Sequence, residues 1–193
     1  MMKPLILAST SPRRAELLRQ IGVDFQIIPS QFAEEPPPAS VTPREYVIGL
    51  ASHKAGQVAA SLKEGIVIGA DTVVVSEGVI LGKPEDPAQA VAMLTALSGK
   101  EHSVFTGVAC LEVPEGNVRL FAEETKVTFR RLQTAEIQSY VATGEPLDKA
   151  GAYGIQGKGA LLVEQIQGCY FNVVGLPLSR LAAVLAEMGV AIW

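Results

Sequence analysis

The stretch Leu5-Ile6-Leu7-Ala8-Ser9-Thr10-Ser11-Pro12-Arg13-Arg14 organises the chain. Its apolar start predicts a short buried strand, and the hydroxyl-rich turn after it leads into a helix. Ser11 suits the N-cap, because its side-chain oxygen can accept a hydrogen bond from a backbone N–H. Pro12 suits the first helical position, where a missing N–H costs nothing. Arg13 and Arg14 fall in the first turn, where the helix dipole disfavours cations. The stretch therefore either carries two solvated arginines or binds an anion.

The composition is that of an ordinary globular protein. The chain has 193 residues, of which 48% are hydrophobic and 19% are charged, unlike a disordered sequence. The net charge of −4 argues against a general nucleic-acid binder, which needs a basic face. No apolar run approaches the roughly 20 residues of a membrane helix, and the N-terminus lacks a signal-peptide pattern. We expect a cytoplasmic protein with no nucleic-acid or membrane partner.

The hydrophobic pattern predicts an α/β fold, with a mixed and twisted sheet because hairpins and crossover helices both occur. No repeat and no linker divides the chain, which predicts a single domain over residues 1–193. The expected strands cover residues 5–8, 24–29, 65–75, 79–81, 102–112, 119–131 and 161–166, with an extended segment at 168–174. The expected helices cover residues 12–20, a segment from 42 onward, 87–97, 134–143 and 178–188.

One carboxylate interrupts the most apolar segment of the chain. Asp71 lies within Gly65–Val75, which is expected to form a central strand, and an unpaired carboxylate would be costly to bury there. A structural ion pair is one explanation. The alternative is a general base, or a ligand of a hard cation such as Mg²⁺, which prefers carboxylate oxygens and substrate phosphates. Glu34, in a proline-braced loop, is either a second such carboxylate or a solvated acid.

Four cations could neutralise a polyphosphate. Arg13 and Arg14 would do so through bidentate contacts, whereas Lys54 and Lys83 would act as point charges. Lys54 falls on or beside the apolar face of its helix, where a lysine is out of place unless its amine reaches a partner. Lys83 lies in a Gly-Lys-Pro turn that restricts its direction. Taken singly, both lysines also fit ordinary surface positions.

The segment Glu145–Gly157 is richer in glycine than simple packing requires. Its glycines would allow close backbone approach, and Gln156 offers a donor and an acceptor that suit the edge of a nucleobase. A long loop without a ligand is the alternative. The sequence has no Gly-x-x-x-x-Gly-Lys-Ser/Thr and no Gly-x-Gly-x-x-Gly motif, so neither a P-loop nor a Rossmann phosphate site is supported.

Together these residues resemble the Maf family of nucleoside triphosphate pyrophosphatases. The matches run in family order over essentially the whole chain, and they are specific as a set although each alone would be weak. The resemblance implies a single elongated α/β domain with a central mixed sheet flanked by helices and two lobes around a cleft. The family is often dimeric, so a homodimer is left open. The matching elements are Ala8–Arg14, Glu34, Leu50–Ala55, Gly69–Val74, Leu81–Pro84, Glu145–Gly157 and Asn172–Leu178.

The resemblance implies a hydrolase that splits a nucleoside triphosphate between its α- and β-phosphates, giving the monophosphate and pyrophosphate. Asp71 corresponds to the proton acceptor that activates water. A divalent cation, Mg²⁺ or Mn²⁺, would be held by Asp71 and Glu34, although the neighbouring Glu35 leaves the register of the loop acid open. The positions implied to bind the triphosphate are Ser9, Arg13, Arg14, Lys54 and Lys83.

The same resemblance bears on the choice of base. Arg13, Thr72 and Gln156 match the positions associated with base selection. Their combination is similar to the branch of the family that acts on dTTP and UTP, and it differs from the branch that prefers 7-methylguanosine triphosphate. This implies a housecleaning role in the nucleotide pool, with modified pyrimidine nucleotides left open as substrates.

Two other functions compete with this interpretation. A nucleotidyltransferase also begins with a strand and a basic phosphate turn, but such turns are rich in glycine whereas this one is rich in serine. The family's association with septum formation suggests a non-enzymatic, nucleotide-binding regulator of cell division. A regulator has no need for Asp71 within an apolar strand, whereas hydrolysis does.

Overall fold

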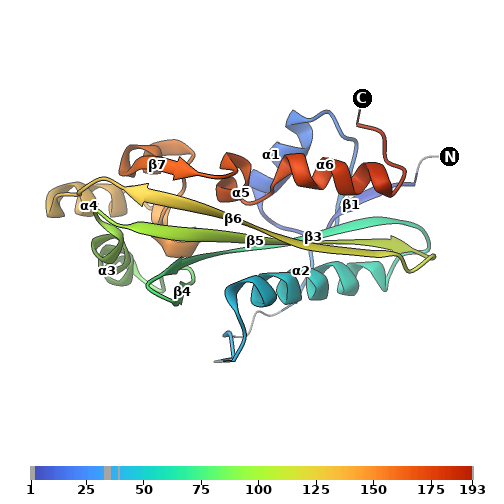
Figure 1. Ribbon diagram of the computed structural model, residues 1–193, viewed down its shortest axis with the longest axis horizontal. Coiled ribbons are helices and arrows are strands. Elements are labelled where there is room, and N and C mark those ends of the chain that lie inside the picture. Colours follow the sequence, from blue (N-terminus) through green and yellow to red (C-terminus); the bar gives the residue numbers. More distant parts are fainter. Residues whose placement is uncertain (1–2, 33–35, 39, 193) are drawn as a thin grey trace. The chain divides into compact units, whose positions relative to one another are not determined.

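A computed structural model describes residues 3–32, 36–38 and 40–192. Within these residues the chain forms a seven-stranded sheet of order β2-β1-β3-β5-β6-β7, with β4 paired to β3 (Figure 1). β1 is parallel to β2 and β3, whereas β4 and β7 are antiparallel to their neighbours. The predicted mixed sheet is therefore confirmed. The strands are β1 (Leu5–Leu7), β2 (Gln26–Ile27), β3 (Gly65–Ser76), β4 (Val79–Leu81), β5 (Glu101–Val113), β6 (Val118–Phe129) and β7 (Val163–Gln167).

Helices account for most of the remaining described chain, as an α/β fold requires. No helix in the described ranges combines the length and the apolar character needed to cross a membrane. The α-helices are α1 (Pro12–Gln20), α2 (Pro43–Ala59), α3 (Pro87–Leu97), α4 (Thr134–Val141), α5 (Tyr170–Val174) and α6 (Leu178–Glu187). Three short 3-10 helices follow α4, namely η1 (Glu145–Asp148), η2 (Ala150–Ala152) and η3 (Gly157–Leu162).

Contacts divide the chain into two compact units. Unit 1 comprises residues 1–71, 106–123 and 175–193, and unit 2 comprises residues 72–105 and 124–174. The strands β3, β5 and β6 contribute residues to both units. Each unit is therefore assembled from segments distant in sequence, and the prediction of one domain over residues 1–193 stays a prediction.

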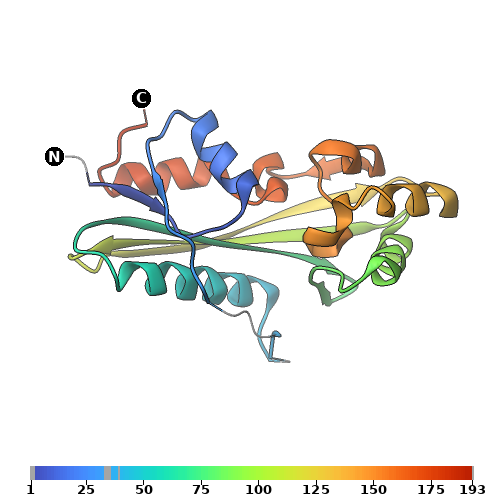
Figure 2. The same cartoon turned by 180° about the vertical axis from the view of Figure 1, so that it is seen from behind.

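In unit 1, helices cover both faces of the sheet. α2 lies on one face, and α1 and α6 lie on the other (Figures 1 and 2). α2 begins as its sequence predicts, with Thr42 at the N-cap accepting a hydrogen bond from the Glu45 N–H at 3.2 Å. Between α2 and the strands, small and branched side chains form a buried cluster of Ile6, Ala8, Ala51, Ala55, Val58, Val67 and Ala109.

In unit 2, α3 and α4 pack on a core that contains a buried histidine. His102 is 3% exposed, and its Nε2 lies 2.8 Å from the Tyr153 hydroxyl oxygen. Burial lowers the pKa of His102 to about 4, so the ring is neutral at neutral pH. The rings of His102, Phe129 and Tyr153 meet edge to face, an arrangement that stabilises aromatic clusters.

Two local predictions were wrong. Residues 168–174 were expected to be extended, but Tyr170–Val174 form α5. Its aromatic, amide and β-branched residues are weak helix formers, and tertiary hydrogen bonds from Asn172 to Val104 O and Thr125 Oγ1, both 3.0 Å, hold it in place. Ser11 does occupy the N-cap of α1, but its side chain makes no capping hydrogen bond.

Candidate functional site

The turn that follows β1 lies alongside the part of β3 that carries Asp71, and both belong to unit 1. β1 ends at Leu7, which pairs in parallel with Ile68 of β3. Ser9 follows two residues after Leu7, and Asp71 three residues after Ile68. Ligands of α/β sheets bind outside the carboxyl ends of the strands. The register therefore places Asp71, which lies inside β3, alongside the turn that carries Ser9 beyond the carboxyl end of β1, where a ligand is expected.

Arg14 fixes this turn to a distant part of unit 1. Its side chain is buried, at 9% exposure. Nε donates to the carbonyl oxygen of Gly175 at 2.9 Å, and Nη1 donates to Ser9 Oγ at 3.3 Å. Ser9 Oγ also accepts from the Ser11 N–H at 3.2 Å. Ser9 and Arg14 are thus brought together, and Arg14 also has a positioning contact that its sequence neighbours did not reveal. Arg13, one residue earlier in α1, is half-buried.

Asp71 and Lys54 form an ion pair with each other. Asp71 is 6% exposed, and Lys54 Nζ of α2 donates to its Oδ1 oxygen. The Lys54 side chain is itself only 13% exposed. Each residue is the partner that the other requires, because a buried charge without an opposite charge would be very costly. The ion pair explains how the carboxylate is tolerated within β3, and it also fixes that carboxylate in one place.

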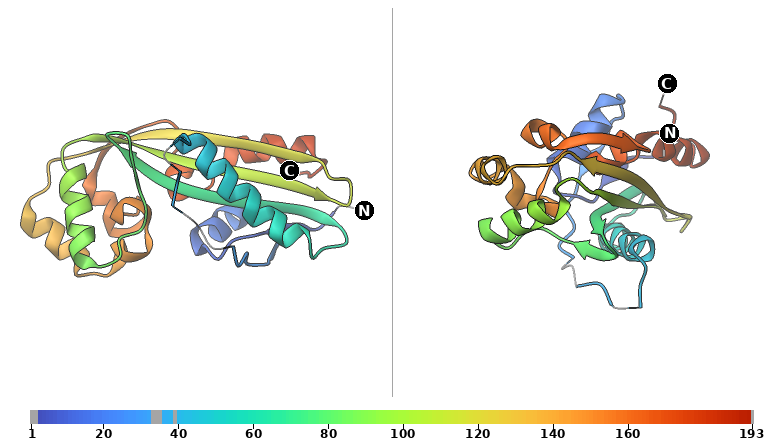
Figure 3. Two further views of the ribbon diagram at one scale, coloured as in Figure 1. Left: turned by 90° about the horizontal axis from the view of Figure 1, so that it is seen from below. Right: turned by 60° about the vertical axis from the view of Figure 1, so that its left-hand side comes forward.

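Two glycines let α2 lie close enough for this pairing. A Cβ atom at Gly69 of β3 would lie 2.2 Å from the carbonyl oxygen of Ala51, and one at Gly107 of β5 would lie 2.3 Å from that of Val47. Figure 3 shows α2 lying across the strands. Gly69 is on the same face of β3 as Asp71, two residues away. Sequence reasoning missed this role, although glycine inside an apolar strand is a known sign of close backbone approach.

Lys83 of unit 2 lies on a turn that is held by a backbone hydrogen bond from η2. Its side chain is exposed, as in an ordinary surface position. The preceding carbonyl, of Gly82, accepts a hydrogen bond from the Gly151 N–H at 3.0 Å. Gly151 has φ 67°, and a Cβ there would lie 2.9 Å from a Val74 side chain atom. Only glycine fits this position, so η2 fixes the turn that carries Lys83.

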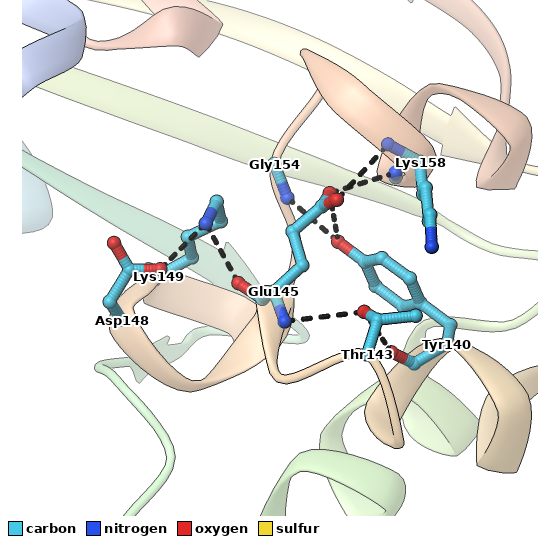
Figure 4. A network of polar contacts seen from close by, with 8 residues as sticks. Tyr140, Thr143, Glu145, Asp148, Lys149, Gly154 and Lys158 are labelled. Carbon is cyan, nitrogen blue, oxygen red and sulfur yellow. Dashed lines mark hydrogen bonds and ion pairs between the residues drawn. The ribbon is translucent and has the colours of Figure 1, made fainter.

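The glycine-rich segment of unit 2 contains the short 3-10 helices η1 and η2 and leads into η3, and residues 153–156 between η2 and η3 are irregular. Gln156 stands at the N-cap of η3, half-buried, while Thr72 is half-buried on β3. Glu145 is the centre of a polar network there (Figure 4). Burial acts to raise the pKa of Glu145, but hydrogen bonds from the Gly159 and Lys158 N–H groups and from Tyr140 outweigh it and lower the pKa. Glu145 is therefore an ionised anchor.

The predicted metal site is described only in part. Glu34 and Glu35 lie outside the described residues, so the structure describes only Asp71 of that pair. No group of three or more His, Cys, Asp or Glu residues is arranged to hold a metal ion anywhere in residues 3–32, 36–38 and 40–192. Mg²⁺ is commonly held by one or two carboxylates together with substrate phosphates. The oxygen donor of Asp71 suits such an ion.

Comparison with known proteins gives matches along nearly the whole chain. A family model described as Maf-like protein matches residues 4–188. The dTTP/UTP pyrophosphatase of Carboxydothermus hydrogenoformans is 54% identical over 185 residues, covering 96% of this chain and 98% of the relative. That of Moorella thermoacetica is 54% identical over 192 residues, covering 100% and 98%.

Solved structures resemble the chain more weakly. A nucleoside-triphosphatase / dITP/XTP pyrophosphatase from Mycobacterium abscessus is 15% identical, with a TM-score of 0.47 over 96% of this chain and 95% of that one. The family assignment rests on the sequence matches instead, which span the strand–turn–helix, the strand acid and the glycine-rich segment alike. The chain belongs to the Maf family.

Proposed function

We propose that this Maf protein is an enzyme that hydrolyses dTTP and UTP to the nucleoside monophosphate and pyrophosphate. Relatives that are 54% identical over nearly their full length are dTTP/UTP pyrophosphatases by name, and this supports the substrates. The observation that carries the chemistry is the buried carboxylate of Asp71, held by Lys54 beyond the carboxyl end of β1. The role of the enzyme in the nucleotide pool would be to remove dTTP and UTP, or modified forms of them.

The reaction requires a water molecule to attack the α-phosphorus while negative charge builds up on the departing pyrophosphate. A carboxylate fixed in one orientation can accept the proton of that water, so Asp71 acts as the general base. Lys54 holds Asp71 in place and adds positive charge beside it. When bound, a divalent cation held by Asp71 and Glu34 would neutralise charge on the phosphate oxygens.

The remaining predicted residues bind and select the substrate. Arg13 and Arg14, with Ser9 and the lysines, neutralise the triphosphate, as preorganised cations do in phosphoryl transfer. Gln156 and Thr72, with Arg13, select the base. The free edge of thymine or uracil presents both a donor and an acceptor, and a side-chain amide offers both in return. A cytoplasmic location and a homodimer remain predictions.

A substrate panel tests this function. Purified protein with Mg²⁺ or Mn²⁺ is expected to release pyrophosphate from dTTP and UTP with kcat/KM at least about tenfold above that for CTP, ATP and GTP, a discrimination of about 1.4 kcal/mol. Equal rates for all bases would contradict the roles of Arg13, Thr72 and Gln156. Tight binding of dTTP without turnover under both metals would favour the nucleotide-binding regulator instead.

A further inference from the structure

The carboxylate of Glu145 and the phenol of Tyr140 hold the segment that carries Gln156. Glu145 Oε1 accepts hydrogen bonds from the Tyr140 hydroxyl at 2.9 Å and from the Gly159 N–H at 3.0 Å. Its Oε2 accepts from the Lys158 N–H at 3.1 Å. On the other side of Gln156, the Gly154 N–H donates to the Tyr140 hydroxyl oxygen at 3.3 Å. The backbone is therefore fixed both before and after Gln156.

The glycines of the segment are explained by this network. A Cβ at Gly159 would lie 2.1 Å from the Gly154 carbonyl oxygen and 2.7 Å from the Tyr140 hydroxyl oxygen. At Gly157, with φ 70°, it would lie 3.0 Å from Glu145 Oε2. Real Cβ atoms essentially never come closer than 3.0 Å to other atoms, which excludes a side chain at Gly159. At Gly157 the positive φ itself favours glycine. The sequence suggested that these glycines allow a nucleobase to approach the backbone. In the structure they allow the backbone to approach Glu145 and Tyr140.

Lys149 supplies a further attachment. Its Nζ donates to the Glu145 carbonyl oxygen at 2.7 Å and pairs with Asp148 Oδ1 at 2.6 Å (Figure 4). The side chain is 14% exposed. A Cβ at Gly154 would lie 2.6 Å from Lys149 Cε, so the lysine stem packs directly on the backbone two residues before Gln156. Charge-assisted hydrogen bonds of this kind are stronger than neutral ones.

Gln156 itself is engaged differently. It is half-buried, and its side-chain amide makes no hydrogen bond with any residue of the described ranges. The backbone on both sides of Gln156 is fixed, and its side-chain amide remains available to bind a ligand. Selective recognition requires this arrangement, because a side chain discriminates between ligands only when its own position is held. The surrounding contacts therefore serve the position of Gln156 rather than its chemistry.

From this arrangement we propose that Glu145 and Tyr140 are positioning residues for base selection, acting through Gln156. The proposal rests on the proposed function, in which Gln156 takes part in choosing thymine and uracil. Neither residue touches the reacting atoms in this proposal. Their loss should therefore change which nucleotide is preferred, and it should leave the chemical step at Asp71 intact.

The test replaces the Glu145 carboxylate, which accepts the hydrogen bonds, by an amide of nearly the same shape. In Glu145→Gln, one carboxylate oxygen becomes an NH₂ group that cannot accept from a backbone N–H. The ratio of kcat/KM for dTTP to that for CTP is expected to fall at least about fivefold, the effect of one lost hydrogen bond. The fall should come mainly from a higher KM for dTTP, with kcat nearly unchanged. Tyr140→Phe should shift the ratio in the same direction.

Two further variants separate positioning from simple loss of stability. Glu136→Gln alters another hydrogen-bonded carboxylate of unit 2, which accepts from the Arg130 side chain and the Gln133 N–H. It is expected to lower thermal stability and leave the dTTP/CTP ratio unchanged. In a Gln156→Ala background, adding Glu145→Gln should cause no further change in the ratio, because coupled residues are not additive.

The outcomes of these experiments distinguish failure of the positioning role from failure of the proposed function, the hydrolysis of dTTP and UTP. A wild-type protein without preference for dTTP and UTP would overturn the proposed function, and the positioning role with it. A selective wild-type protein whose Glu145→Gln and Tyr140→Phe variants keep the full ratio would overturn the positioning role alone. Equal loss of selectivity in Glu136→Gln would also overturn it, since the effect would then follow stability.

Discussion

Replacing Asp71 by asparagine is expected to lower kcat for dTTP by about 10²- to 10⁴-fold, the contribution typical of general acid–base catalysis. The amide has nearly the same shape but cannot take a proton from water at neutral pH. Nucleotide binding should survive, because the cations proposed to neutralise the triphosphate remain. Steady-state release of pyrophosphate measures the loss of kcat, and calorimetric titration with dTTP measures the retained affinity.

Asp86→Asn is the matched control for this substitution. Asp86 is the N-cap of α3 and accepts a hydrogen bond from the Gln89 N–H at 2.7 Å. Asparagine and aspartate are similarly good N-cap residues, so both activity and stability should remain near those of the wild-type protein. If Asp71→Asn retained more than about a tenth of the wild-type kcat, well outside the range of a lost general base, the Lys54–Asp71 ion pair would be structural only.

Gly69→Ala is expected to destabilise the protein by about 1–3 kcal/mol, the usual cost of overpacking a core. The added methyl group would start 2.2 Å from the Ala51 carbonyl oxygen and 2.9 Å from the Ala55 backbone nitrogen, so α2 would have to move away from β3. That movement would carry Lys54 away from Asp71. Because displacements near 1 Å can cost about 10²-fold in rate, activity should fall even where the variant is fully folded. Urea unfolding and pyrophosphate release measure the two effects.

Gly56→Ala places the same methyl group on α2 itself. Apart from its chain neighbours and the nearby backbone of α2 itself, no atom lies within 4 Å of a Cβ built at Gly56. Glycine within a helix is less stable than alanine by about 0.5–1 kcal/mol. This variant should therefore be slightly more stable than the wild-type protein and equally active. A Gly69→Ala variant with wild-type stability and activity would show that the glycines of the sheet do not determine the position of α2.

Elements with local signals were predictable from the sequence. The capping residue Thr42, the N-cap Asp86 and the N1 proline Pro12 mark helix starts that the structure confirms. α5 was missed because contacts of Asn172 with residues far along the chain stabilise it. The 3-10 turns of the glycine-rich segment were not predicted, because the segment is held by hydrogen bonds to Glu145 and such an anchor leaves no periodic pattern.

The sequence could mark candidate site residues but not the contacts between them. The sequence marked Asp71 and Lys54 as charges that each needed a partner, yet only the crossing of α2 over β3 brings these two together. The contact of Arg14 with the Gly175 carbonyl spans 161 residues, and no local pattern encodes it. The roles of all the proposed site residues stay predictions, and those of Thr72, Lys83 and Gln156 rest on resemblance to the family alone.

Hydrolysis of dTTP in ¹⁸O-labelled water tests the central claim most directly, because the label reports which phosphorus the water attacks. If the water activated by Asp71 attacks the α-phosphorus, mass spectrometry will find the label in dTMP and none in pyrophosphate. Label in the pyrophosphate, or formation of dTDP and inorganic phosphate, would contradict the proposed reaction.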